Sequence, residues 1–181
     1  MLTVPACLAC NNRKSRHDDF LRDILVTDVA AEGHPVTQQL FQNKTIRSHE
    51  QGKSLVARIA LSSAQPVAYL NSDGEPDIAY VSRFDSARAD EMFGYIVRGL
   101  YYARFKKSLS ATTNVTVRRL SKSDVDQVVT LFNEVGANGP FELGDGVFSC
   151  VYNYGANTPE ASIWLLEFYG CIQYSAITAP K

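Results

Sequence analysis

The spacing of apolar residues changes near residue 65, and this change constrains the fold more than any other feature of the chain. Before it, apolar residues recur at helical spacing, most clearly in residues 17–31. After it, the runs QPVAYL and DIAYVS flank NSDGEP, whose Asp73-Gly74 pair favours a β-hairpin turn. A chain with helices first and hairpin-linked strands afterwards is typical of an α+β domain.

The same spacing predicts the remaining helices. The clearest one follows residue 85 and buries a face that includes Phe93 and Val97, and a later one is capped by Ser121 or Ser123. In that later helix we expect Val125, Val128, Val129 and Phe132 to be buried. The predicted helices lie within residues 5–14, 17–31, 36–41, 45–62, 85–106 and 124–135.

The second half of the chain also contains strand-like runs. The segment GANGPFELGDG (residues 136–146) is interpreted as a loop because it is rich in glycine and contains a proline. Trp164 lies in a run dense in apolar residues, where packing is its expected role. With the runs NVTVRRL, VFSCVYNY, ASIWLLEFY and CIQYSAIT as strands, we expect an antiparallel sheet of about five or six strands packed with two longer helices.

Length and composition limit the class of protein. The 181 residues, 45% of them hydrophobic, suffice for one well-packed domain. Apolar runs are all shorter than the roughly 18 residues that a membrane-spanning helix needs, and the start MLTVPACLACNNRK does not resemble a signal peptide. Four cysteines without a signal peptide favour reduced thiols. We therefore expect a soluble, cytoplasmic protein with no membrane partner.

Charge is distributed unevenly although the net charge is only −1. Residues 124–180 contain seven acids and no Lys or Arg, whereas residues 98–122 contain seven Lys or Arg and no acid. A cationic run of this kind can contact the phosphates of nucleic acid. It can equally be a solvated surface that the acidic C-terminal third balances in three dimensions.

The most specific motif is V-P-A-C-L-A-C-N-N-R-K-S in residues 4–15. It resembles the last part of an HNH endonuclease motif, where a second C-x-x-C opens the short helix of a ββα-metal fold. The resemblance implies two C-x-x-C pairs around a structural zinc, a hairpin with a catalytic histidine between them, Asn11 near the metal and Lys14 facing phosphate. The runs I-V-R-G-L-Y-Y and S-x-W-x-L-x-F-Y extend the likeness to bacterial HNH-containing proteins over nearly the whole chain.

The sequence departs from the HNH pattern at its start. Only six residues precede Cys7, so the first C-x-x-C and the catalytic hairpin are missing. We therefore expect residues 1–16 to be a remnant of the HNH helix, residues 17–181 to form a single α+β body, and no catalytic residue to be present. A structural zinc needs four ligands. Cys7, Cys10 and His17 are the candidate ligands; the alternatives are a site shared by two subunits of a homodimer and two ordinary thiols without a cofactor.

Two functional hypotheses follow, from different classes. The first is a nucleic-acid-associated, HNH-like protein that binds DNA or RNA, or an active nuclease if its true start lies upstream. The second is a protein-interaction module, such as a phage or bacterial inhibitor or regulator, that presents its acidic C-terminal sheet to a partner. Under the first hypothesis the phosphate-binding residues are Arg13, Lys14, Arg16, Arg98, Arg104, Lys106, Lys107, Arg118 and Arg119.

Overall fold

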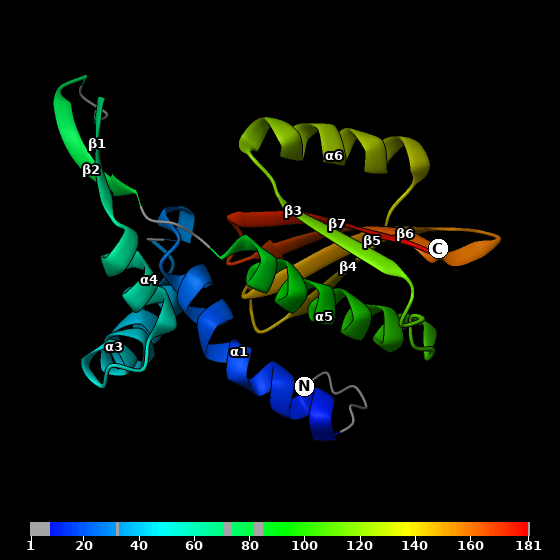
Figure 1. Cartoon of the computed structure of the whole chain (residues 1–181). Helices are drawn as coiled ribbons and strands as arrows, with labels where there is room; N and C mark the ends of the chain where they lie inside the picture. Colours follow the sequence, from blue (N-terminus) through cyan, green and yellow to red (C-terminus); the bar gives the residue numbers. More distant parts are fainter. Residues whose placement is uncertain (1–7, 32, 71–73, 82–84, 181) are drawn as a thin grey trace.

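The computed structural model describes residues 8–31, 33–70, 74–81 and 85–180, and it has the predicted α+β architecture. Helices make up the first third of the chain, a short hairpin follows, and a helix-covered antiparallel sheet makes up the rest (Figure 1). None of the helices in the described ranges is both long and apolar enough to cross a membrane.

The N-terminal third is a group of helices around one long helix. That helix, α1 (Leu8–Val26), is uninterrupted, whereas the sequence predicted two helices meeting near residue 16. It continues because residues 15–19 contain no helix breaker and Phe20, Leu21 and Ile24 bury one face of its second half. The shorter elements are η1 (Val29–Ala31), α2 (Pro35–Leu40), the π-helical η2 (Phe41–Ile46), α3 (Arg47–Glu50) and α4 (Leu55–Ser63).

The helix predicted for residues 45–62 is two separate helices. The break falls between α3 and α4, where Gly52 has φ of 65° and ends the first helix. Ser54 then begins α4, because its side chain accepts a hydrogen bond from the backbone N–H of Ala57 at 3.1 Å.

The main sheet has five antiparallel strands in the order β3-β7-β6-β5-β4. One of them, β4, lies in the segment predicted to be a loop. It forms a strand because residues 141–143 pair with residues 148–150 of β5, and a bulge between Asn138 and Phe141 accommodates the glycine and proline. The strands are β3 (Asn114–Arg119), β4 (Asn138–Leu143), β5 (Phe148–Gly155), β6 (Thr158–Phe168) and β7 (Ile172–Ala179).

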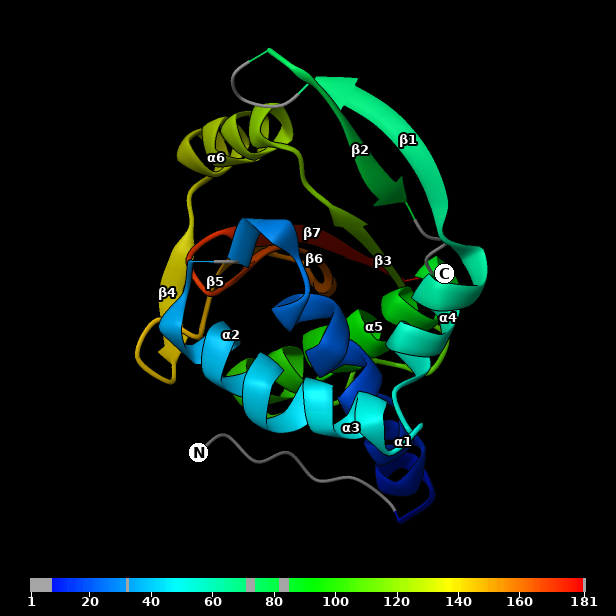
Figure 2. The same cartoon turned by 90° about the vertical axis from the view of Figure 1, so that its left-hand side faces the viewer.

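One face of this sheet forms the core of the protein with α5 (Ser86–Phe105), which lies across it (Figure 2). The strand residues on this face alternate with residues on the other face, as the period of a strand requires. Trp164 is 1% exposed, which confirms its predicted packing role. The helix contributes Met92, Phe93, Val97, Leu100 and Tyr101, and the strands contribute Cys150, Tyr152, Leu166, Ile172, Tyr174 and Ala176.

The other face of the sheet is covered by α6 (Lys122–Val135), which connects one edge strand, β3, to the opposite edge strand, β4 (Figures 1 and 2). Ser121 caps α6 in a capping box with Asp124, as one of the two sequence alternatives predicted. The predicted burial of its apolar face is wrong in part. Phe132 is buried, Val125 and Val128 are half-buried, and Val129 is 42% exposed, because α6 crosses the sheet with few close contacts.

The predicted hairpin forms, but as a separate two-stranded sheet of β1 (Gln65–Leu70) and β2 (Pro76–Val81). It projects from the body of the protein (Figures 1 and 2). Each residue of β1 is exposed, and Leu70 and Ile78 are among the most exposed large apolar side chains of the described chain. The six strands implied by the sequence therefore do not share one sheet. The two strands of the hairpin form a sheet of their own, and β4 is the fifth strand of the main sheet.

Candidate nucleic-acid interface

The structure separates the basic residues of residues 98–119 into two groups. One group makes contacts within the protein. Arg98, in α5, donates from its guanidinium to the backbone carbonyls of Ser110 at 3.0 Å and Thr113 at 2.7 Å. Its charge therefore holds the loop that leads from α5 to β3.

Arg118 and Arg119, the last two residues of β3, point to opposite faces of the sheet. Arg118 lies 3.2 Å from Asp124 at the start of α6, while its own side chain is 71% exposed. The hydroxyl and backbone N–H of Ser121 and the nearby Arg118 guanidinium lower the pKa of Asp124. This pair joins the predicted cationic run to the acidic C-terminal third.

Arg119 connects the sheet to the N-terminal helices. Both of its terminal nitrogens donate to the carboxylate of Asp28, which follows α1, and its guanidinium lies 5.9 Å from the ring centroid of Tyr174. Burial raises the pKa of the Tyr174 hydroxyl, so this group is neutral at physiological pH. The charge of Arg119 is thus balanced within the fold.

The second group consists of Arg104, Lys106 and Lys107, and we call it the basic end. These residues lie in the last turn of α5 and just beyond it, and all three are exposed. Within the described ranges of the chain, none of them forms an ion pair. Lys106 caps the helix in a left-handed conformation with φ of 54°. Cations near a helix C-terminus are also favoured by the helix dipole, so this placement is stabilising on its own.

The first half of α1 lies beyond the contact of this helix with α5, which joins Phe20 and Ile24 of α1 to the first turns of α5. Arg13, Lys14 and Arg16 are in this half of α1, whose backbone is helical, but their side chains lie outside the described part of the structure. The phosphate contacts predicted for these three cations therefore stay a prediction.

A pocket of about 300 Å³ lies beside the basic end, between α5 and the edge strand β4. Arg104 lines it from the helix, and its guanidinium lies 5.9 Å from the ring centroid of Tyr152. Trp164 stacks on Tyr152 with ring centroids 4.7 Å apart. The sequence did not predict this pocket, because one wall is formed by β4, the segment interpreted as a loop.

A larger pocket, about 430 Å³, lies at the other end of α5. Its polar lining includes three carboxylates, those of Asp28, Asp85 and Asp90, and a single cation, Arg119. Asp85 accepts a hydrogen bond from the backbone N–H of Arg88 and so caps α5. This excess of negative charge disfavours phosphate, so the two ends of α5 have opposite electrostatic character.

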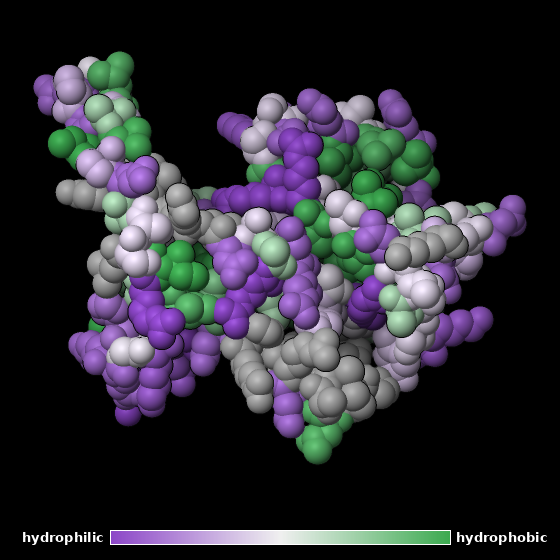
Figure 3. Space-filling view, viewed as in Figure 1, coloured by the Kyte–Doolittle hydropathy of each residue, from purple (hydrophilic) through white to green (hydrophobic). Residues whose placement is uncertain are grey.

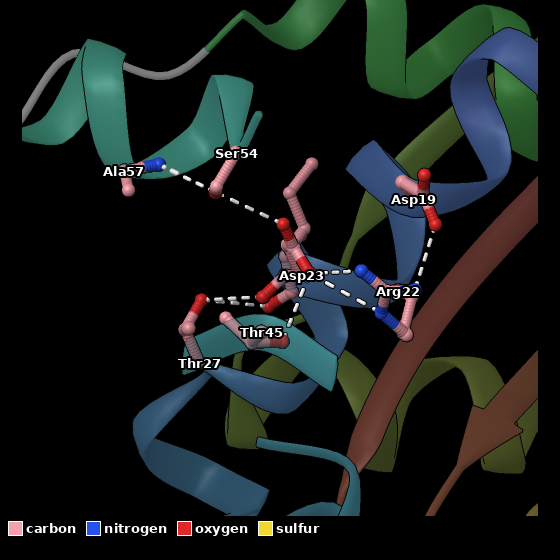
Figure 4. A network of polar contacts seen from close by, with 8 residues as sticks. Asp19, Arg22, Asp23, Thr27, Thr45, Ser54 and Ala57 are labelled. Atoms are coloured by element: carbon pink, nitrogen blue, oxygen red, sulfur yellow. Dashed lines mark hydrogen bonds and ion pairs between the residues drawn. The ribbon is translucent and has the colours of Figure 1, made fainter. Parts of the chain in front are cut away.

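A buried polar network holds the N-terminal helices together (Figure 4). Asp23 of α1 is 1% exposed, and its carboxylate accepts hydrogen bonds from Arg22, from Thr45 at 2.9 Å and from Ser54 at 3.0 Å. Arg22 also contacts Asp19 at 2.7 Å. The network joins α1 to η2 and to the start of α4. Each buried side-chain nitrogen and oxygen atom of the network has a hydrogen-bond partner, so its role is structural.

The predicted metal ligands lie largely outside the described residues. Cys7 precedes them, and the side chains of Cys10 and His17 within α1 are not described. Cys10 and His17 are seven residues apart on this helix, which corresponds to about 10.5 Å along its axis. No group of three or more His, Cys, Asp or Glu in the described ranges is arranged to hold a metal ion. The zinc site stays a prediction.

Two further cysteines belong to the sheet and its turns. Cys150 is buried in β5 at the pocket beside the basic end, and burial raises the pKa of its thiol to about 12. Cys171 is half-buried, and its pKa is also raised by burial. A thiol with so high a pKa is protonated near neutral pH and is a poor nucleophile, so the structure gives Cys150 a packing role.

Comparisons with protein-family models, with curated proteins and with solved structures give no match for this chain.

Proposed function

We propose that this protein binds nucleic acid through the basic end. The observation that carries the proposal is the concentration of Arg104, Lys106 and Lys107 in and just beyond one helical turn, exposed and without an acidic partner in the described chain. Such cations neutralise phosphates and release counterions, which is the main source of affinity in non-specific nucleic-acid binding. Arg13, Lys14 and Arg16 of α1 stay candidates for further phosphate contacts.

Contacts within the protein reduce the number of arginines proposed to bind phosphate. Arg98, Arg118 and Arg119 were expected to touch phosphates, but their guanidinium groups are used by backbone carbonyls or by aspartates. A phosphate would compete with these partners for Arg98 and Arg119, whereas Arg118 is 71% exposed and contacts Asp124 through one nitrogen. The proposed interface therefore has at its centre the end of α5 rather than β3.

The test is fluorescence anisotropy with labelled DNA and RNA at several salt concentrations. If the three cations of the basic end each neutralise one phosphate of duplex DNA, they account for a slope of about −2.7 in the logarithm of the association constant against that of salt. Replacing Arg104, Lys106 and Lys107 by Gln should weaken binding and flatten the slope by that amount. No binding by the wild-type protein at about 50 mM salt would overturn the proposal, since electrostatic contacts are strong there.

A matched control uses lysines elsewhere on the surface. Lys44 lies in η2 and Lys53 in the loop between α3 and α4, and both are exposed. Their double replacement by Gln removes the same type of charge as the Lys106 and Lys107 pair, and it should leave binding nearly unchanged. An equal loss in both double variants would mean that net charge, rather than the basic end, drives the association.

The HNH relationship is part of the same proposal, and it rests on the C-x-x-C-N-N segment at residues 7–12. Native mass spectrometry of the protein from its own host reports the chain mass and any bound zinc together. A zinc ion lost on replacing Cys7 and Cys10 by Ser would support the relationship. A metal-free protein would count against a zinc knuckle but would leave the basic end untouched.

A protein-interaction role is the second proposal, and the exposed hairpin favours it. Val67, Tyr69, Leu70 and Ile78 expose apolar surface on a two-stranded sheet, which is rarely stable without a covering partner (Figure 3). The acidic C-terminal third supports it less, because Asp124 pairs with Arg118 and Glu167 accepts hydrogen bonds from Ser149 and Gln173. Light scattering distinguishes a homodimer from a monomer, and a pull-down with Leu70→Lys as control tests for another protein.

A further inference from the structure

The pocket beside the basic end has the composition of a site for a flat apolar group. Trp164 and Tyr152 stack on each other in its wall, and Phe141, which is 36% exposed, lines it from β4. Leu100 and Ala103 of α5 form the opposite side. Arg104, the one charged side chain in the lining, belongs to the basic end itself.

The position of β4 keeps this pocket in place. Gly139 has φ of 113°, a conformation that favours glycine, and a Cβ atom there would lie 2.9 Å from the carbonyl oxygen of Cys150. The backbone of β4 can therefore approach β5 closely at this point, and Pro140 and Phe141 are held against the end of α5. The wall is part of the sheet rather than a separate loop.

We propose that this pocket accepts an unpaired nucleobase of a single-stranded nucleic acid, while the phosphates beside that base contact Lys106 and Lys107. This inference rests on the proposed function and assigns it a substrate class. The exposed ring of Phe141 and the plane of the Arg104 guanidinium provide stacking surfaces for any base, while Tyr152 and Trp164 are buried in the wall of the pocket. The cations next to the pocket match the anionic backbone that carries the base.

The size of the pocket and the pairing of bases support the same assignment. About 300 Å³ lies at the lower end of the volumes of small-ligand pockets, which suits one base rather than a larger folded ligand. In a duplex each base is paired and stacked and cannot enter a pocket without being flipped out, at a cost of a few kcal/mol. Single strands should therefore bind more tightly than duplexes of the same sequence.

The chain carries its own reporter for this site. Trp164 is the single tryptophan of the protein, and it lines the pocket. A base in the pocket would change the surroundings of the buried Trp164 and so the intensity of tryptophan emission, whereas phosphates bound only by lysines should not. The experiment titrates the protein with an unlabelled 15-nucleotide single strand and with a hairpin duplex, and it records emission together with the anisotropy of labelled versions of both.

Two variants test the pocket without changing the charge of the protein. Ala103→Met places a larger side chain into the pocket from α5, and Phe141→Ala removes an aromatic wall. Each should weaken single-strand binding at least about fivefold, the loss expected for one stacked base, and should leave duplex binding unchanged. Ala87→Met is the control, because Ala87 is exposed near the other end of α5. Circular dichroism verifies that each variant is folded.

The possible results distinguish the base pocket from nucleic-acid binding by the basic end alone. Emission that changes with single strands but not with duplex, together with a selective loss in Ala103→Met, supports the base pocket. Salt-sensitive anisotropy with equal affinity for both nucleic acids and no change in emission would overturn the base pocket but keep the basic end. Constant anisotropy at about 50 mM salt with either nucleic acid would overturn both.

Discussion

The two faces of the five-stranded sheet are built from the same strands, yet they are covered very differently. On the face toward α5, Trp164 is 1% exposed and Leu166, Ile172 and Ala176 are fully buried. On the face toward α6, Ile177 is 52% exposed although it lies one residue from Ala176. The two covering helices cause this difference. The large side chains of α5 pack against those of the strands, whereas Phe132 is the one buried residue of α6.

This contrast shows which face of the sheet contributes most to the stability of the fold. Burial of apolar area stabilises the fold in rough proportion to the area removed from water, so most of that stabilisation comes from the α5 face. The α6 face and the hairpin keep apolar side chains in solvent, as Figure 3 shows for the hairpin and α6. The basic end and its pocket lie at the margin of the buried layer, on a rigid helix.

The largest expected effect on stability comes from removing a buried side chain between α5 and the sheet. Phe93→Ala removes a fully buried ring whose centroid lies 4.0 Å from that of Tyr174 and 5.8 Å from that of Phe168. We expect a loss of about 3–5 kcal/mol in the free energy of unfolding, because a cavity remains in a packed layer. Urea unfolding followed by circular dichroism measures it; a loss below about 1 kcal/mol would mean that this layer is not the core.

The next effect concerns the helices that pack outside α5. Asp23→Ala leaves Thr45, Ser54 and part of the Arg22 guanidinium without their buried acceptor. We expect a loss of about 2–3 kcal/mol, because unsatisfied buried donors cost more than a net hydrogen bond. Hydrogen exchange should place the loss in α1, η2 and α4 and spare β5 to β7. Faster exchange throughout the sheet would show that the two regions unfold together.

A matched ring on the α6 face should matter less. Phe132→Ala removes the one buried side chain of α6. Because α6 stands over a half-exposed surface, the space left behind can be reached by solvent, and we expect a loss near 2 kcal/mol, below the usual range for a buried phenylalanine. Unfolding measured in parallel with Phe93→Ala gives the comparison directly. Equal losses would contradict the distinction between the two faces.

The smallest effect is a pH dependence at the start of α6. The pKa of Asp124 is lowered from 3.8 by its hydrogen bonds with Ser121 and by Arg118. A carboxyl with a lowered folded-state pKa contributes stability above its unfolded pKa, and this contribution is lost as pH falls through the folded value. Asp124→Asn should therefore be less stable than wild type at pH 7 and indistinguishable near pH 2. A difference that persists at low pH would assign the effect to helix propensity.

The cationic run of residues 98–119 shows that the fold decides which charges have partners. The sequence places Arg98, Arg104, Arg118 and Arg119 in one cationic run. In the fold, Arg119 contacts Asp28, which is 91 residues away, and Arg98 donates to backbone carbonyls, whereas Arg104 has no acidic partner in the described residues. The interpretation as a charge balanced in three dimensions is confirmed for Arg118 and Arg119, whereas phosphate contact stays a prediction.

Local structure could be inferred from the amino-acid sequence alone. Apolar spacing predicted the face of α5, the two strands of the hairpin, the three final strands and the burial of Trp164, and Ser121 was one of two serines predicted to cap α6. These features depend on periodicity and capping within a few residues, so no distant contact was needed to infer them.

The tertiary structure alone decided the rest. β4 is a strand because β5 lies beside it, and a segment rich in breakers gave no local sign of that pairing. The burial of α6 depended on how closely it approaches the sheet, and the free or paired state of each arginine depended on which aspartate the fold brings near. The pocket between Arg104 and Phe141 exists because a helix and an edge strand 37 residues apart meet. Such contacts join residues far apart in sequence, and local spacing carries no information about them.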